Sequence, residues 1–308
     1  MISSILKKSL QQETKQSKID SGNDISVCAT KDAVALVAKR GAATVIFERQ
    51  IDGVAGLSAA LADLALQANV RGRPASLILG ADFYDLLLTD EPNLPSHEIE
   101  DAVRWQISDR VSGNPEKSII RCFNAKSLIS ERQHAKLYAA VVDDTFLEVF
   151  GMAFLGAGIR LKSIQIAELA VARYLHTISV DPLSAAVVCG QETGMTVIQH
   201  KNDFLFSRRF VFNSSSSRFE QIQQSIAGAQ RYLQNQFGGN YLETWLLLDD
   251  GHKGTDQEFI DIRKQLSSIA NLKMSGTPLS LEAVVGMGAQ ISTDWPSLAS
   301  SIPERFAA

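Results

Sequence analysis

Two glycines in a predicted β-hairpin raise the question of a phosphate-binding loop. The stretch VCGQETGMTVIQHKNDFLFSRRF (residues 188–210) has the pattern strand, turn, strand, turn, strand, and its first turn holds Gly190 and Gly194. Glycine lets backbone N–H groups approach phosphate oxygens closely, so such a turn is typical of a nucleotide site. It is equally typical of a plain hairpin, and the surrounding residues must decide between the two.

Other arrangements of reactive side chains give weaker signals. The histidines show neither H-x-x-x-H nor H-E-x-x-H spacing, so we expect surface histidines and no metal site. They are His97, His134, His176, His200 and His252. The sequence also lacks G-x-S-x-G and G-x-x-x-x-G-K-[ST] motifs. The pair Asp143-Asp144 is either an acid/base pair or a helix cap, and the cap is the simpler interpretation.

Composition narrows the class of protein. The chain has 308 residues, 45% of them hydrophobic, and a net charge of -4. This length suits one large domain or two joined ones, and the charge balance argues against a nucleic-acid binder. Cys28, Cys122 and Cys189 are far apart among apolar residues, so we expect buried free thiols in a reducing compartment. No apolar run reaches the roughly 18 residues of a membrane span.

The N-terminal residues 1–20 are mostly polar. No small-residue cleavage site follows their short apolar patch, so we expect no signal peptide and a cytoplasmic location. We expect a flexible tail, because residues 11–20 have almost nothing to bury. The alternative is a weak membrane-surface contact through one helical face. Its apolar and neighbouring basic residues are Ile2, Ile5, Leu6, Lys7 and Lys8.

Alternating strands and helices make up the rest of the chain. Apolar residues with a period of two, or in short continuous runs, predict strands at 25–29, 33–39, 44–48, 75–80, 84–89, 118–126, 136–142, 160–166, three within 185–212, 245–248 and 272–274. Helical spacing predicts helices at 54–70, 96–111, 145–155, 167–178, 219–237, 256–268 and 279–291. Ser96 is the predicted N-cap of the second helix, and Gly238-Gly239 are predicted to end the fifth.

The sequence contains an internal repeat. Residues 27–49 can be laid over residues 188–210 without gaps, so that Cys28 meets Cys189 and Val37 meets Ile198. Both copies precede a helix and then a buried strand. The matching order predicts a duplicated α/β fold, in which each half is a three-stranded meander followed by further helices and strands.

A duplicated half of this layout with an insertion resembles the actin/hexokinase/heat-shock-protein superfamily. Within it, LPSHEIEDAVRWQISDRV (residues 94–111) resembles the helix entry of PilM-type type IV pilus assembly proteins, especially the MshI proteins of MSHA pili. The segments SIQIAELAVARYL, FLFSRRF and QIQQSIAGAQRYLQNQF match the family in their order. The resemblance covers residues 25–291.

The resemblance implies a division of the chain into an actin-like fold with an insertion subdomain. We expect a flexible tail at 1–20, a first actin-like half at 21–82 and 143–180, an insertion subdomain at 83–142, a second half at 181–296, and a tail at 297–308.

In the ATP-binding members of this superfamily, both hairpins begin Asp-x-Gly and the aspartate holds magnesium. The residues at these places are Cys28, Ala29 and Thr30 in the first hairpin, Cys189, Gly190 and Gln191 in the second, and Gly251 near a third, adenosine-contacting element. Asp32 and Glu192 lie further along the turns. The resemblance therefore implies a degenerate nucleotide site, with no cofactor, no metal and no hydrolysis. Bound ATP, as in a sugar-kinase or ATPase-like enzyme, is the alternative.

The resemblance also implies a function and a partner. It implies a cytoplasmic scaffold, peripheral at the inner membrane, that binds the N-terminal cytoplasmic peptide of a bitopic PilN-like protein; the cytoplasmic part of a type II secretion platform protein is the alternative. We expect the peptide in a groove where residues 96–111 and 118–126 face residues 25–48, paired with an exposed strand edge. The expected contact residues are Arg104, Trp105, Arg110 and Arg121. Packing within the insertion is the alternative role for Trp105.

Overall fold

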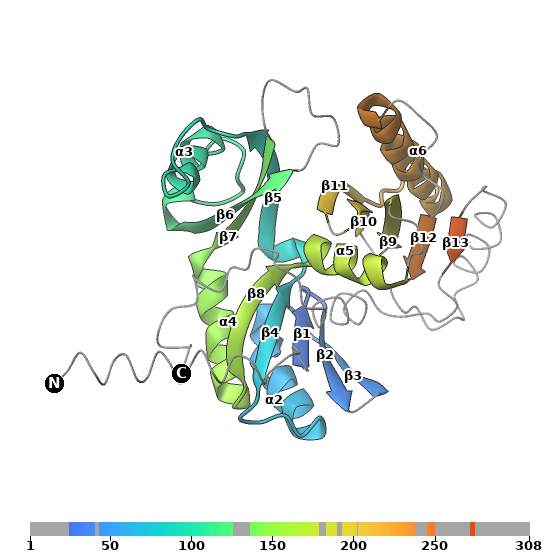
Figure 1. Cartoon of the computed structure of the whole chain (residues 1–308). Helices are drawn as coiled ribbons and strands as arrows, with labels where there is room; N and C mark the ends of the chain where they lie inside the picture. Colours follow the sequence, from blue (N-terminus) through green and yellow to red (C-terminus); the bar gives the residue numbers. More distant parts are fainter. Residues whose placement is uncertain are drawn as a thin grey trace.

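The structure is a computed structural model, and it describes residues 25–40, 43–125, 136–178, 183–189, 193–201, 203–237, 245–249 and 272–274 (Figure 1). The tails, the helices predicted at 256–268 and 279–291, and Gly238-Gly239 lie outside these residues. Within them, no helix has the length and apolar character that crossing a bilayer requires.

The first large sheet begins with an antiparallel meander. It consists of β1 (Ile25–Ala29), β2 (Ala33–Arg40) and β3 (Ala43–Gln50), followed by the parallel strands β4 (Pro74–Leu79) and β8 (Arg160–Ile166), in the order β3-β2-β1-β4-β8. Helices α2 (Leu57–Gln67), which follows the short turn η1 (Val54–Gly56), and α4 (Asp144–Ala157) pack side by side against this sheet. The central strands β1 and β4 are almost entirely apolar, with one buried serine each (Ser26 and Ser76), because both of their faces are buried.

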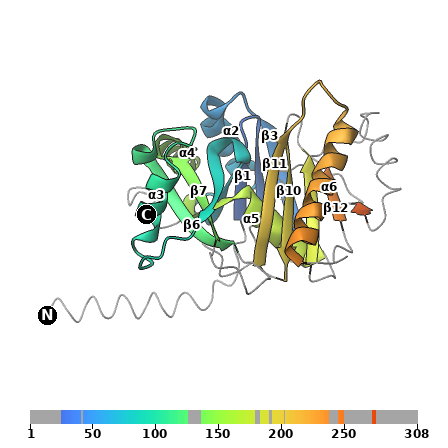
Figure 2. The same cartoon turned by 90° about the horizontal axis from the view of Figure 1, so that it is seen from above.

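The second large sheet repeats this topology. Its strands are β9 (Leu183–Cys189), β10 (Thr193–His200), β11 (Asp203–Val211), β12 (Trp245–Asp249) and β13 (Leu272–Met274), in the order β11-β10-β9-β12-β13. Each strand stands where its counterpart stands in the first sheet, which confirms the predicted duplication. Helix α6 (Arg218–Phe237) packs on its outer side, and α5 (Ala167–Ile178) contacts both large sheets (Figure 2).

The gapless alignment of the two hairpins is wrong by one residue. In the first hairpin the last pair before the turn is Ala29 with Val34, and in the second it is Cys189 with Gly194. Ala29, not Cys28, is therefore the counterpart of Cys189. The slip could not be seen in the sequence, because β1 and β9 are buried on both faces and a shift by one residue leaves their apolar pattern unchanged.

A smaller antiparallel sheet interrupts the first half. It is formed by β5 (Tyr84–Asp90), β7 (Lys136–Asp143) and β6 (Ser118–Ala125) in the order β5-β7-β6, with the short turns η2 (Ala81–Phe83) and η3 (Pro115–Lys117) before β5 and β6. Helix α3 (Ile99–Gln106) covers one face through Val103 and Ile107. We call this sheet together with α3 the small unit.

Helix α3 is shorter than predicted, and its cap is different. It spans eight residues rather than 96–111, and its N-cap is Glu98, not Ser96. The reason is local: the Glu98 N–H donates to the Pro95 carbonyl at 2.9 Å, which closes a separate turn ahead of the helix. After Ile107 the chain continues in turns.

The small unit contacts both halves, but not where the sequence predicted. On the first half, Phe83, which directly precedes β5, packs edge-on against Phe146 and Phe150 of α4, with ring centroids 5.4 and 5.0 Å apart. On the second half, Phe204 of β11 packs against Phe123 of β6 and Tyr138 of β7, at 5.8 and 5.1 Å. Strand β6 therefore faces β11, and the prediction that it faces residues 25–48 is wrong.

The predicted helix cap at Asp143 is confirmed. The Asp143 carboxylate accepts hydrogen bonds from the hydroxyl and the backbone N–H of Thr145, at 2.6 and 2.8 Å, at the start of α4. These bonds, the hydroxyl first, lower the pKa of Asp143 below its ordinary value. The ionised carboxylate is therefore the form that stabilises the helix.

Replacement of this cap makes a pH-dependent prediction. We expect Asp143→Ala to lower the free energy of unfolding by about 1 kcal/mol at neutral pH. The lowered pKa means that the contribution is fully present above the unfolded pKa of about 3.9 and is lost as the pH falls through the folded pKa. Urea titrations at about pH 7 and about pH 2.5 measure it. Asp144→Ala is the matched control, and equal losses for the two variants would contradict the assignment.

Candidate functional site

The turn of the first hairpin is closed by its own residues. Thr30 donates its backbone N–H to the Ala33 carbonyl at 2.9 Å, and its hydroxyl oxygen accepts the Ala33 N–H at 3.1 Å. Cys28 is fully buried in the strand before the turn. The polar atoms of Thr30 thus hold the turn together from inside.

A carboxylate lies against the same turn. The backbone N–H of Lys31 donates to the Asp82 carboxylate at 3.2 Å. Asp82 is brought there by Gly80, whose N–H donates to the Ala29 carbonyl at 2.7 Å; a Cβ at position 80 would lie 2.7 Å from that oxygen. Only glycine permits this approach. The Lys31 N–H of the turn is therefore occupied by the negatively charged carboxylate of Asp82.

Packing between strands accounts for one of the two glycines in the second hairpin. A Cβ at Gly194 would overlap the ring of Phe210 on the neighbouring strand β11, so packing requires a glycine there. Gly190, Gln191 and Gly251 lie outside the described residues. Cys189 is fully buried at the end of β9.

Cys122 is also unsuited to nucleophilic chemistry. Burial, and secondarily the charge of Glu100, raise the pKa of the Cys122 thiol to about 12. A thiol with this pKa stays protonated near neutral pH. Among the described residues, no group of three or more His, Cys, Asp and Glu side chains is placed to hold a metal ion.

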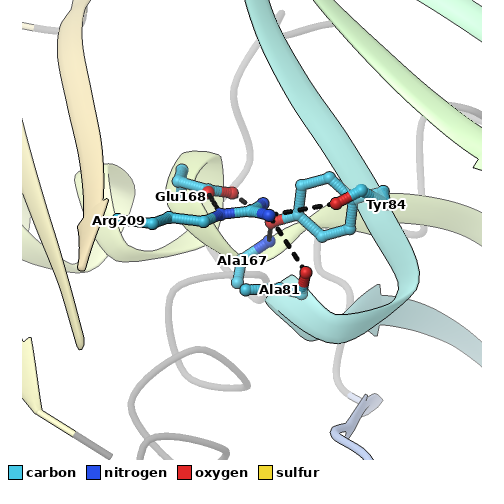
Figure 3. A network of polar contacts seen from close by, with 5 residues as sticks. All are labelled: Ala81, Tyr84, Ala167, Glu168 and Arg209. Atoms are coloured by element: carbon cyan, nitrogen blue, oxygen red, sulfur yellow. Dashed lines mark hydrogen bonds and ion pairs between the residues drawn. The ribbon is translucent and has the colours of Figure 1, made fainter. Parts of the chain in front are cut away.

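A buried ion pair joins the three sheets at one point (Figure 3). Glu168, at the start of α5, is fully buried, and its carboxylate accepts from Nε of Arg209 on β11 at 2.7 Å. The Tyr84 hydroxyl on β5 donates to the same carboxylate and accepts the Ala167 N–H at 3.1 Å. Arg209 also donates to the carbonyls of Ala81 and Tyr84, both at 3.0 Å. We call these residues the junction.

Arg209, Glu168 and Tyr84 interact in a way that stabilises the charged form of the arginine. The guanidinium carbon of Arg209 lies 4.3 Å from the centre of the Tyr84 ring. Burial alone would lower the pKa of Arg209, but Glu168 and Tyr84 outweigh it and raise that pKa. Burial, followed by the charge of Glu168, raises the pKa of Tyr84 well above its ordinary value. The junction therefore holds a charged arginine, its carboxylate and a neutral tyrosine between the first half, the second half and the small unit.

Sequence patterns did not single out the junction. Glu168 appears in the sequence as an acidic residue in the first turn of a predicted helix, which is an ordinary place for a glutamate. Arg209 follows another arginine in a predicted strand. Strand alternation does not reveal Arg209 either, because Phe204, Phe206 and Phe210 alternate in step with Arg208, and the irregularity near Phe204 that changes the faces is not visible in the sequence.

The three arginines predicted to contact a partner make hydrogen bonds or ion pairs within the small unit. Arg104 donates to the carbonyls of Pro115 and Ser118, the latter at 2.8 Å. Arg121 pairs with Glu100 at 2.6 Å, and Arg110 lies 3.4 Å from the Leu88 carbonyl. These contacts tie α3 and the chain after it to the two edge strands of the sheet.

The outer edge of β6 is covered by these side chains. Its outward carbonyls at Ser118 and Ile120 accept from Arg104 and Arg121, at 2.8 and 2.9 Å, and the Cys122 N–H donates to Glu100 at 3.4 Å. An added strand needs those backbone groups for its own hydrogen bonds. The expected pairing of a peptide with this edge would have to displace three side chains.

Trp105 differs from its arginine neighbours. It lies on α3 with 76% of its surface exposed, whereas Val103 and Ile107 on the same helix are fully buried. The interpretation of Trp105 as a packing residue of the insertion is therefore wrong. A large apolar side chain left in water on an ordered helix is typical of a binding surface.

The two matching large sheets, the shared helix α5 and the small unit define an actin-like α/β fold. Solved structures that are similar to this structure have the same fold. The PilM–PilN type IV pilus biogenesis complex matches with a TM-score of 0.61 at 15% identity, over 93% of this chain and 99% of the other.

Two further structures match less closely. The cytoplasmic domain of EpsL, an inner-membrane component of the type II secretion system of Vibrio cholerae, has a TM-score of 0.52 at 12% identity, over 87% of this chain and 95% of that one. A Bacteroides thetaiotaomicron protein of actin-like ATPase fold and unknown function has a TM-score of 0.52 at 10% identity, over 87% and 96%. No protein-family model matches the chain, and no curated protein matches its sequence significantly.

Proposed function

We propose that this protein is a cytoplasmic scaffold of a type IV pilus assembly platform, of the MSHA type, with residues 83–142 as its insertion subdomain. It sits peripherally at the inner membrane by binding the N-terminal cytoplasmic peptide of a bitopic PilN-like protein. The proposal is supported by the likeness to the PilM–PilN complex over nearly the whole length of both chains. It is also supported by the sequence features that resemble the MshI proteins.

The observation that carries the partner site is the exposure of Trp105. The arginines beside it are tied to carbonyls and to Glu100, so we assign them the task of holding α3 in place. Trp105 is then the anchor that enters a pocket formed with the bound peptide, since tryptophan is common among residues that dominate binding energies. The peptide is recognised through its side chains rather than by strand addition at β6.

We further propose that the nucleotide site is degenerate and that the protein is not an enzyme. The first turn does not fit a magnesium-bound phosphate, because the Lys31 N–H already serves the Asp82 carboxylate and Thr30 closes the turn. Without a bound cation, the Asp82 carboxylate would also repel a phosphate at this place. The packing of Gly194 against Phe210 gives that glycine a structural reason.

Titration with the peptide tests the scaffold. The probe is the N-terminal cytoplasmic peptide of the bitopic pilus protein encoded beside this chain, and we expect a heat or anisotropy change at micromolar concentrations. Absence of binding to the folded protein at high micromolar peptide would remove the proposal. Magnesium-dependent release of phosphate from ATP, abolished by changing Asp32, would favour the ATPase-like alternative instead.

A further inference from the structure

Among the described residues, those at one end of the first sheet carry basic charges and no acidic ones. The parallel strands β1, β4 and β8 begin at this end, the antiparallel β2 ends there, and the opposite end meets the second half at the junction (Figure 1). Residues 38–40, 43–45, 66–74 and 155–163 form it and contain no Asp or Glu. Their basic side chains, all exposed, are Lys39, Arg40, Arg71, Arg73, Arg160 and Lys162. We call this surface the basic edge.

Hydrogen bonds between loops fix the basic edge. Arg40 donates to the Ala68 carbonyl at 2.7 Å, which ties the end of β2 to the loop before β4. The Gly72 N–H donates to the Gly158 carbonyl at 2.6 Å, and Nε of Arg160 donates back to the Gly72 carbonyl at 3.2 Å. The six cations therefore stand on connected backbone, in a chain whose net charge is -4.

Exposed apolar side chains lie at the same end of the molecule. Helices α2 and α4 lead into the parallel strands β4 and β8, so their last turns end at the basic edge. Leu66 and Leu155 lie in those turns and Met152 lies one turn earlier in α4, with 64%, 60% and 58% of their surfaces exposed, respectively. Fully charged surfaces bind ions or acidic proteins without such residues, whereas a bilayer interface accepts both kinds of side chain.

The chain enters the described structure at this edge. Residues 1–24 join β1 at Ile25, and the first eight residues include Ile2, Ile5, Lys7 and Lys8. The same combination of apolar and basic side chains thus occurs in the segment attached to the basic edge.

We infer that the basic edge is a docking surface for an anionic phospholipid bilayer. The lysines and arginines contact headgroup phosphates, and Leu66, Met152 and Leu155 enter the interfacial layer. This goes beyond the proposed function, because it requires no partner peptide and uses the end of the molecule away from the small unit. It would orient the protein with the first half toward the membrane.

Vesicle flotation tests the inference with the full chain. The probes are vesicles of phosphatidylcholine alone and vesicles with about one third phosphatidylglycerol. We expect binding to the anionic vesicles at low ionic strength, little binding to the neutral ones, and weakening with added salt, because the Debye length shortens to about 3 Å at 1 M. Equal partition into both kinds of vesicle, or into neither, would overturn the inference.

A charge-reversal variant locates the surface. Lys39→Glu, Arg71→Glu and Lys162→Glu together should lower the partition coefficient by about 100-fold or more, since each basic residue near an anionic surface contributes about fivefold. These three were chosen because Arg40 and Arg160 hold the loops together. The matched control reverses Lys117, Lys201 and Arg231, which are exposed elsewhere, and should retain most of the binding.

Two outcomes would refute the basic edge as the site. One is an equal loss in both triple variants, which would mean that only the net charge matters. The other is full binding by the edge variant combined with complete loss in Lys7→Glu/Lys8→Glu, which would assign binding to the N-terminal segment alone. Circular dichroism of each variant checks that it is folded. Peptide binding should be unchanged in the edge variant, so the two proposals fail independently.

Discussion

Arg209→Met is expected to lower the free energy of unfolding by about 3 kcal/mol. The substitution keeps the length of the side chain but leaves the Glu168 carboxylate fully buried without its cation, and two carbonyls without their donor. Removing one partner of a buried pair typically costs about 3–5 kcal/mol, and the partial exposure of Arg209 places this case at the low end. Urea unfolding followed by fluorescence and circular dichroism measures it.

The matched control for this experiment is the neighbouring residue. Arg208 is exposed on the same strand, so Arg208→Met should change the stability by no more than about 0.5 kcal/mol. The double variant Glu168→Leu/Arg209→Met should be more stable than the sum of the single variants predicts, because no unpaired charge remains. Equal effects at Arg208 and Arg209, or simple additivity in the double variant, would contradict the role of the junction.

Local patterns were sufficient to predict most of the elements. Strand β8 and helix α5 begin and end at the predicted residues, because the alternation of apolar and polar residues in β8 and the helical spacing in α5 do not depend on distant partners. The cap at Asp143 was predicted for the same reason. The predicted start of helix α3 was wrong because the chain forms a separate turn, closed by the hydrogen bond from Glu98 to Pro95, in place of the first helical residues. The spacing of apolar residues does not show which of the two structures forms.

Features that depend on pairing between distant segments could not be predicted. The register of the hairpins was missed by one residue, since strands buried on both faces carry no alternation to fix it. The junction joins Tyr84, Glu168 and Arg209 from three separate parts of the chain. The hydrogen-bond partners of Arg104 and Arg121 could not be predicted either, because the carbonyl and carboxylate groups that they contact come close only when the small unit folds.

Trp105→Ala is expected to weaken binding of the partner peptide about 30-fold or more while leaving the stability nearly unchanged. The binding loss follows from removing a large anchor from the centre of a contact, which typically costs about 2 kcal/mol or more. The stability change should stay within about 0.5 kcal/mol, because the side chain is mostly in water in the free protein. Isothermal titration and urea unfolding on the same preparations give both quantities.

Two further variants of α3 separate recognition from support. Asp101→Asn changes an exposed residue on the same helix and should affect neither quantity. Arg104→Met should reduce stability as well as affinity, because it removes the donor to the Ser118 carbonyl and so weakens the attachment of α3 to β6. Trp105→Phe should retain part of the affinity, since a smaller ring fills part of the pocket. Wild-type affinity in Trp105→Ala would place the peptide elsewhere on the molecule.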